Sequence, residues 1–195
     1  MTGKPYKEVK KIATEINNFL NKGKLRINKT NMNIILFFQK YSQMSRSQQG
    51  LAGAGEWETL RKLLPDFKDK RVLDLGCGYG WHCIYAMEHG ASSVVGVDIS
   101  HKMLEVAKEK THFPQVEYKC CAIEDVEFPE ESFDVILSSL AFHYVADYEI
   151  LVKKIYRILK SGGKLVFTVE HPVFTAYGTQ DWHYNEKGEI LHFPV

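Results

Sequence analysis

The fold of this 195-residue chain is decided by the stretch Val72-Leu73-Asp74-Leu75-Gly76-Cys77-Gly78-Tyr79-Gly80. Its apolar first half predicts a buried strand. The alternating glycines that follow let the backbone turn tightly and approach a ligand without obstruction by Cβ atoms. Residues 81–89 then have a helical pattern that ends at Gly90. We therefore expect a strand, a tight turn and a helix whose free N–H groups lie at the turn.

The alternation of strands and helices continues along the chain. Helical patterns cover residues 101–110 and 147–160, and further strands are predicted over 93–97, 116–120, 133–137 and 164–169. Continuously apolar strands indicate a mostly parallel sheet that is covered on both faces. The predicted fold class is α/β, a three-layer α/β/α, Rossmann-like architecture. Such sheets bind ligands at the carboxyl ends of their strands.

The N-terminal part differs in charge from the rest. Residues 1–35 hold eight Lys or Arg and two Glu, whereas the whole chain has a formal net charge of +1. We interpret residues 1–35 as a basic, helical extension, either solvated or in contact with an acidic partner, and residues 36–195 as one domain. Residues 24–50 lack a regular pattern, and a short helix fits 56–64. The balanced total charge disfavours nucleic acid as a partner.

A carboxylate follows the second predicted strand. Asp98 lies 24 residues after Asp74, at a strand end where it can accept two hydrogen bonds from a ribose diol. The alternative role is a cap for the helix that begins near Ser100. A dinucleotide fingerprint would place a third glycine at position 81, where this chain has Trp81. That residue argues against an NAD(P)-dependent oxidoreductase.

Four motifs together resemble those of class I S-adenosylmethionine (SAM)-dependent methyltransferases, over residues 41–172. Residues 72–80 resemble motif I, 95–100 the acidic motif of strand two, 132–136 motif IV, and 159–165 the turn before strand five. The resemblance implies a Rossmann-like methyltransferase fold, SAM as cofactor and S-adenosylhomocysteine as product. It also implies a small-molecule methyl acceptor, as for the related quinone-biosynthesis enzymes.

The resemblance implies a set of cofactor contacts as well. Asp98 would hold the ribose, and Ile99 and Met103 would enclose adenine. Ala122 stands where the family has an aspartate, which leaves the Ile123 N–H and Glu124 as adenine contacts. The remaining candidates lie in the glycine turn, after strand four and in the N-terminal segment: Asp74, Gly76, Cys77, Gly78, Gly80, Ser138, Ser139, Tyr41 and Arg46.

The chemistry of methyl transfer requires few catalytic groups. A sulfonium methyl is already electrophilic, so the protein must align an acceptor, exclude water and, for O or N acceptors, remove a proton. His143 and His171 follow predicted strand ends and are the candidate bases, although each histidine can equally be structural. The four cysteines lack metal-site spacing, so we predict no metal site and reduced thiols in a cytoplasmic protein. No apolar run is long enough to span a membrane.

The C-terminal part departs from the family. Only 26 residues follow Val169, where the family adds two further strands, and residues 181–184 and 189–193 predict a hairpin instead. We therefore expect a sheet without its last two strands. Either the chain is a truncated product, or the exposed edge is covered by the N-terminal segment or by a homodimer partner. Weakened or absent methyl transfer is the corresponding expectation, and a non-catalytic SAM-binding protein is the main alternative function.

Overall fold

A computed structural model describes residues 41–171, 183–184 and 190–192. Two compact units divide the chain, Ile27–Val169 and a second unit made of Met1–Arg26 with Glu170–Val195. In the second unit, β6 (His183–Tyr184) pairs antiparallel with β7 (Ile190–His192). This pairing confirms the predicted hairpin for its described residues. The predicted helical extension over residues 1–35 lies outside the described residues.

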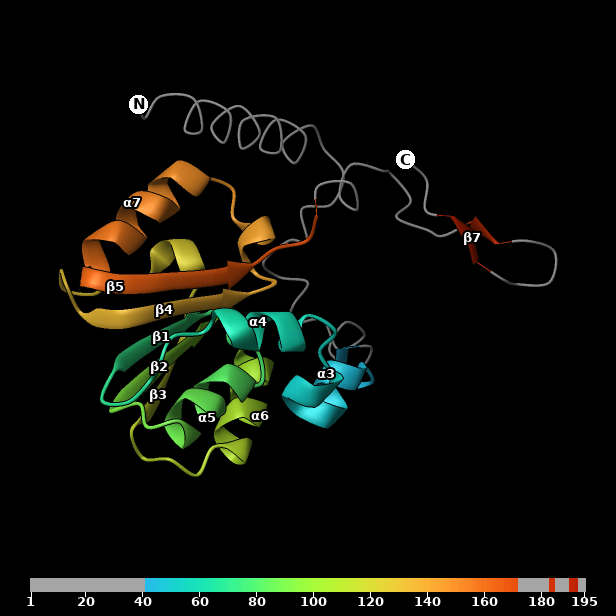
Figure 1. The fold of residues 1–195 in the computed structure, drawn as a ribbon, viewed down its shortest axis with the longest axis horizontal. Helices are drawn as coiled ribbons and strands as arrows, with labels where there is room; N and C mark the ends of the chain where they lie inside the picture. Colours follow the sequence, from blue (N-terminus) through green and yellow to red (C-terminus); the bar gives the residue numbers. More distant parts are fainter. Residues whose placement is uncertain (1–40, 172–182, 185–189, 193–195) are drawn as a thin grey trace. The chain divides into compact units, whose positions relative to one another are not determined.

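A five-stranded sheet forms the centre of the first unit (Figure 1). Its strands have the order β3-β2-β1-β4-β5, and every pairing between them is parallel. Their bounds are Arg71–Leu75 (β1), Ser93–Asp98 (β2), Val116–Cys120 (β3), Phe133–Ser139 (β4) and Leu159–Thr168 (β5). The order reverses between β1 and β4, which places the binding crevice of such a fold at the carboxyl ends of these two strands.

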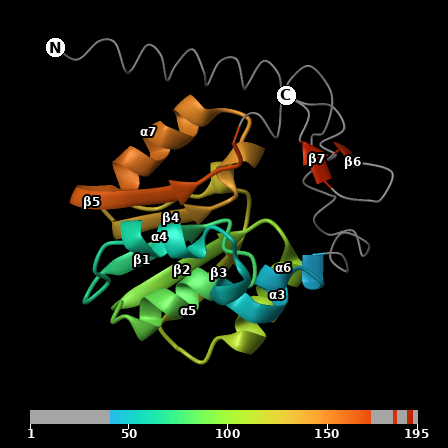
Figure 2. The ribbon, with the colours of Figure 1, turned by 45° about the vertical axis from the view of Figure 1, so that its right-hand side comes forward.

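Helices cover both faces of this sheet. In both views α7 (Tyr148–Ile158) lies on one side and α5 (Trp81–Glu88) and α6 (His101–Lys110) lie on the other (Figures 1 and 2). Because side chains alternate along a strand, Leu73 and Leu75 pack in the cluster that contains Leu151 of α7. Val72 packs instead in the cluster that contains Cys83 of α5. The predicted three-layer α/β/α architecture is thus confirmed.

The boundary between α7 and β5 differs from the prediction. The helix was expected over 147–160 and the strand over 164–169, but α7 ends at Ile158 and β5 begins at Leu159. Leu159 pairs with Phe133 of β4, and the register then shifts so that Lys164 pairs with Val135. Residues 160–163 have no partner in this register, and Gly162 has a φ of 76°, so the glycines form an irregularity within β5 where the sequence pattern predicted a turn.

The segment before β1 contains more regular structure than its sequence pattern indicates. Residues 24–50 were expected to be irregular, but α3 (Ser45–Gln49) lies within them and is followed by a 3-10 helix, η2 (Gly50–Gly53). The predicted helix over 56–64 corresponds to α4 (Trp57–Leu63). Helices as short as α3 depend on tertiary contacts. Among the described helices, none has the length and apolar character required to cross a membrane.

Candidate functional site

The glycine turn, Gly76–Gly80, begins where β1 ends. Gly76, Gly78 and Gly80 have φ values of 82°, 53° and 76°, a region that favours glycine. A Cβ atom on Gly76 would lie 2.3 Å from Cβ of Ala141, so no larger residue fits there without displacement. The N–H groups of Gly76 and Cys77 donate to the Val97 carbonyl at 2.8 and 2.9 Å. These bonds fix the turn to the end of β2.

Asp98 at the end of β2 lies directly against the glycine turn. Gly78 N donates to its Oδ2 at 2.9 Å, and Ser100 N donates to its Oδ1 at 2.8 Å. A carboxylate has about four acceptor positions, so Asp98 keeps room for further donors such as ribose hydroxyls. Burial raises the pKa of Asp98, and these backbone donors oppose that rise. The helix cap itself is Ser100, whose Oγ accepts from Met103 N at 3.4 Å.

Two predicted candidates lie in the core beneath the turn. The Asp74 side chain is 1% exposed, and Cys83 Sγ donates to its Oδ2 at 3.5 Å. Burial is the main reason why the pKa of Asp74 rises to about 7. Burial likewise raises the pKa of the Cys77 thiol. The side chains of Asp74 and Cys77 are both buried in the core under the turn, so Cys77 contributes only its backbone to the surface of the turn.

The predicted adenine contacts lie on two segments that flank the turn. Ile99 and the buried Met103 belong to the β2–α6 connection and the first turn of α6. Ile123 and Glu124 belong to a 3-10 turn, η3 (Ile123–Asp125). Ile123 Cδ1 lies 3.5 Å from the position that a Gly76 Cβ would occupy. The structure therefore brings η3 directly beside the glycine turn.

Tyr41 lies over the other side of the glycine turn. Its hydroxyl oxygen is 3.4 Å from the position of a Gly78 Cβ, and its ring meets Tyr79 edge-on with centroids 5.5 Å apart. Burial raises the pKa of Tyr41, and the nearby Arg46 cation partly offsets this effect. The phenol therefore remains protonated at neutral pH. Tyr41 is thus placed beside the turn, as its predicted role requires.

A polar network links the N-terminal segment to the ends of β4 and β5. Glu56 Oε1 accepts from Arg46 Nη2 and, at 3.0 Å, from Ser139 Oγ. Ser139 Oγ in turn lies 3.1 Å from Thr168 Oγ1, which accepts from Leu140 N at 3.1 Å. Burial acts to raise the pKa of Glu56, but its backbone N–H, Arg46 and Ser139 together hold that pKa below its ordinary value.

Sequence reasoning missed Glu56 and Thr168 in this network. Ser139, by contrast, was predicted and lies in it. The other predicted serine, Ser138, is buried and donates to the Leu75 carbonyl at 2.8 Å, so its hydroxyl ties β4 to β1. No local pattern identifies Glu56, because its partner Ser139 is 83 residues away in the sequence.

The two candidate bases are in different units. His143 lies in the 3-10 turn η4 (Phe142–Tyr144) that follows β4, with its ring 4.1 Å from that of Tyr144. His171 belongs to the second unit. A further histidine, His82, stays neutral at pH 7 because burial lowers its pKa to about 4. In the described ranges, no group of three or more His, Cys, Asp or Glu side chains could hold a metal ion.

Comparisons with known proteins are consistent with this geometry. A family model described as a methyltransferase domain matches residues 73–167. The crystal structure of a candidate S-adenosylmethionine-dependent methyltransferase from Listeria monocytogenes is 57% identical, with a TM-score of 0.68. That match covers 72% of this chain and 66% of the Listeria chain.

Two curated relatives extend the comparison. An uncharacterised protein of Haemophilus influenzae is 38% identical over 170 residues, which cover 80% of this chain and 65% of that protein. The ubiquinone biosynthesis O-methyltransferase of Coxiella burnetii is 36% identical over 112 residues, covering 56% of this chain and 47% of that enzyme. This chain therefore spans less than two thirds of the length of both relatives.

Proposed function

This chain belongs to the class I S-adenosylmethionine-dependent methyltransferase family, and we propose that it binds SAM beside the glycine turn and transfers the methyl group to a small-molecule acceptor. The observation that supports this most directly is the bond from Gly78 N to Asp98 Oδ2. This bond joins the turn to the carboxylate at the carboxyl edge of the sheet. In the proposed function, these two parts together bind the adenosyl group.

The residues around the turn fit such a cofactor. Asp98 would accept from the ribose hydroxyls, and Ile99 with the Ile123 N–H would bind the adenine. Tyr41 and Arg46 would contact the amino-acid end. When bound, SAM supplies a methyl group that is already electrophilic. The protein then has to orient the acceptor and exclude water.

We place the acceptor beside the carboxyl end of β4. Ser139 and η4 follow that strand, so His143 is the proton acceptor that we propose for an O or N nucleophile. A small-molecule acceptor is supported by the name of the Coxiella burnetii relative, an O-methyltransferase of ubiquinone biosynthesis. His171 remains a second candidate base.

One observation favours a non-catalytic SAM-binding protein as the alternative. Ala122, at the start of η3, has no side-chain acceptor for the adenine amino group. Incubation with labelled SAM and an extract of small metabolites separates the two functions. Label in a small molecule supports transfer, whereas SAM binding without any labelled product supports the alternative.

Binding of the adenosyl group is tested with Asp98→Ala and S-adenosylhomocysteine in isothermal titration calorimetry. We expect the Kd to rise about 10- to 100-fold, because charge-assisted hydrogen bonds to the ribose are lost. Asp134→Asn is the matched control. Asp134 Oδ2 also accepts a backbone bond, from Arg71 N at 2.9 Å, but Asp134 lies at the start of β4. Equal affinity of Asp98→Ala and the unaltered protein would contradict the proposed site.

A further inference from the structure

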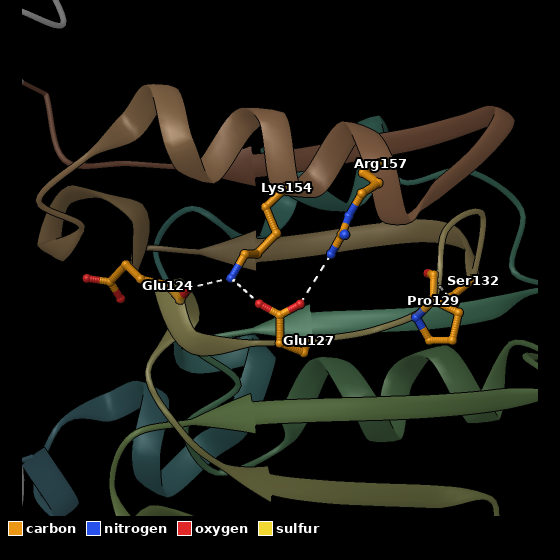
Figure 3. A network of polar contacts seen from close by, with 6 residues as sticks. All are labelled: Glu124, Glu127, Pro129, Ser132, Lys154 and Arg157. Atoms are coloured by element: carbon orange, nitrogen blue, oxygen red, sulfur yellow. Dashed lines mark hydrogen bonds and ion pairs between the residues drawn. The ribbon is translucent and has the colours of Figure 1, made fainter.

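Lys154 of α7 makes two polar contacts, one with η3 and one with the segment that follows it. Its Nζ donates to the Glu124 carbonyl oxygen at 2.7 Å and to Glu127 Oε1 at 3.0 Å (Figure 3). Arg157, one turn further along α7, donates to the other oxygen of Glu127 at 3.2 Å. The Lys154 side chain is only 16% exposed although Glu127 is 71% exposed. The ammonium group is thus held in one position by partners on two sides.

The contact with Glu124 acts on the backbone of η3. The Glu124 carbonyl belongs to the same peptide group as the Asp125 N–H, which donates to the Ala122 carbonyl at 3.0 Å and closes the turn. A cation bound to one end of a peptide group polarises it and strengthens the hydrogen bond at the other end. Lys154 therefore stabilises the closed form of η3.

The other end of η3 is attached to β2. Cys121 N donates to the Asp98 carbonyl at 3.1 Å, so the chain enters η3 from the end of the strand that bears Asp98. Between these two attachments, Ile123 lies against Gly76. The backbone N–H groups of η3 are thus held at a set distance from the glycine turn.

A base beside the glycine turn would face Ala122 at the start of η3, which offers only a methyl group and no acceptor for an amino group. The Glu124 side chain points away from Lys154 (Figure 3), so Lys154 acts on the backbone of η3 and not on that carboxylate. Recognition of the base edge then depends on backbone groups, whose positions must be accurate to discriminate one base from another. The element that fixes those positions becomes part of the specificity of the site.

We propose that Lys154, held by Glu127 and Arg157, is a positioning residue that sets the preference of this site for adenine over other purine bases. The inference rests on the proposed function, because it assumes an adenosyl ligand. Lys154 acts through η3 and does not itself contact the ligand.

The test compares two ligands that differ only in the purine base. S-adenosylhomocysteine and its deaminated counterpart, S-inosylhomocysteine, are titrated against the unaltered protein and against Lys154→Met, which keeps most of the side-chain volume. We expect Lys154→Met to raise the Kd for S-adenosylhomocysteine about five- to tenfold and the Kd for S-inosylhomocysteine much less. The preference for adenine, measured as the ratio of the two Kd values, then becomes smaller. Lys154→Arg, which retains the charge, should restore most of the preference.

Lys153→Met is the matched control on the same helix. Lys153 Nζ pairs with Glu149 at 3.0 Å, and its side chain is 74% exposed. This variant should bind both ligands as the unaltered protein does. An unchanged ratio of the two affinities in Lys154→Met overturns the inference, and so does an equal loss for both ligands, which would indicate a purely structural role.

A second measurement keeps the inference testable if Lys154→Met does not fold. Glu127 is exposed, so Glu127→Gln should leave folding intact, and it removes the charge that orients Lys154. Like Lys154→Met, this variant should have a smaller preference for adenine. Without ligand, amide hydrogen exchange over residues 122–126 should be faster in this variant, and unchanged exchange overturns the inference. If the unaltered protein binds no S-adenosylhomocysteine, the proposed function itself fails and the inference fails with it.

Discussion

Two glycines with almost the same backbone conformation show how a single residue is constrained. Gly76 and Gly162 have φ values of 82° and 76°. A Cβ on Gly76 would lie 2.3 Å from Cβ of Ala141, whereas among the described residues nothing lies within 4 Å of a Cβ on Gly162. Conformation alone favours glycine at position 162, while conformation and close packing both require it at position 76.

This difference predicts unequal effects of the same substitution. Gly162→Ala should lower the free energy of unfolding by about 1–2 kcal/mol, the cost of a side chain in the left-handed region. Gly76→Ala adds an overlap with Ala141, and its total cost should reach about 3–5 kcal/mol. Urea unfolding followed by far-UV circular dichroism measures both losses. Equal losses would show that Ala141 moves aside without cost.

At the scale of elements, an ion pair and a hydrogen bond connect α3 to the end of a sheet strand. Arg46 of α3 pairs with Glu56, and Glu56 is bonded to Ser139 at the end of β4. Both partners of the ion pair are mostly buried, with 24% and 22% of their side chains exposed. Glu56 therefore connects α3 to the sheet and aims Arg46, the residue that we propose for the amino-acid end of the cofactor.

Glu56→Gln tests this role. With a neutral partner, Arg46 is held less firmly, so the Kd for S-adenosylhomocysteine should rise about three- to tenfold. The affinity for methylthioadenosine, which lacks the amino-acid end, should change little. Glu58→Gln is the control, since Glu58 forms an exposed pair with Arg61 at 3.0 Å. A similar loss for both ligands would mean that Glu56 only supports the fold.

The elements themselves could largely be predicted from the sequence. The strands predicted over 93–97 and 116–120 correspond to β2 and β3, and the helix predicted over 101–110 coincides with α6. The predicted start of β5 was wrong because Leu159 pairs with Phe133 of β4, and a local helix-ending signal does not indicate such a pairing. Glu56 was missed for the same kind of reason. Its role depends on contacts with residues distant in sequence, and no spacing pattern contains them.

At the scale of the whole molecule, a buried carboxyl group lies beneath the proposed binding site. Asp74 is in the central strand of the sheet, with only a thiol donor from Cys83 to compensate its charge in the contacts described for its side chain. Burial, aided by the nearby Asp98 charge, raises its pKa to about 7, whereas a carboxyl of this type ordinarily titrates at 3.8. The folded state therefore favours the protonated form.

The consequence is a stability that falls as pH rises. Since folded Asp74 binds its proton more tightly than the unfolded chain does, its contribution is fully present below about pH 4 and is lost as pH rises towards about 7. The loss amounts to at most about 4 kcal/mol. Asp98, whose pKa is also raised, acts in the same direction. Glu56 and Asp134 have lowered pKa values, so their contribution to stability has the opposite pH dependence. It is lost as pH falls, in a range below the ordinary pKa of a carboxyl group.

Asp74→Asn isolates this contribution, because the amide keeps the shape of the side chain and cannot ionise. Urea unfolding of both proteins at several pH values between about 4 and 8 gives two stability curves. We expect the unaltered protein to lose stability relative to Asp74→Asn across this range, so that the variant is the more stable of the two at pH 8. Parallel curves would mean that Asp74 is ionised in the folded protein throughout, with its charge compensated by the peptide groups of the glycine turn above it.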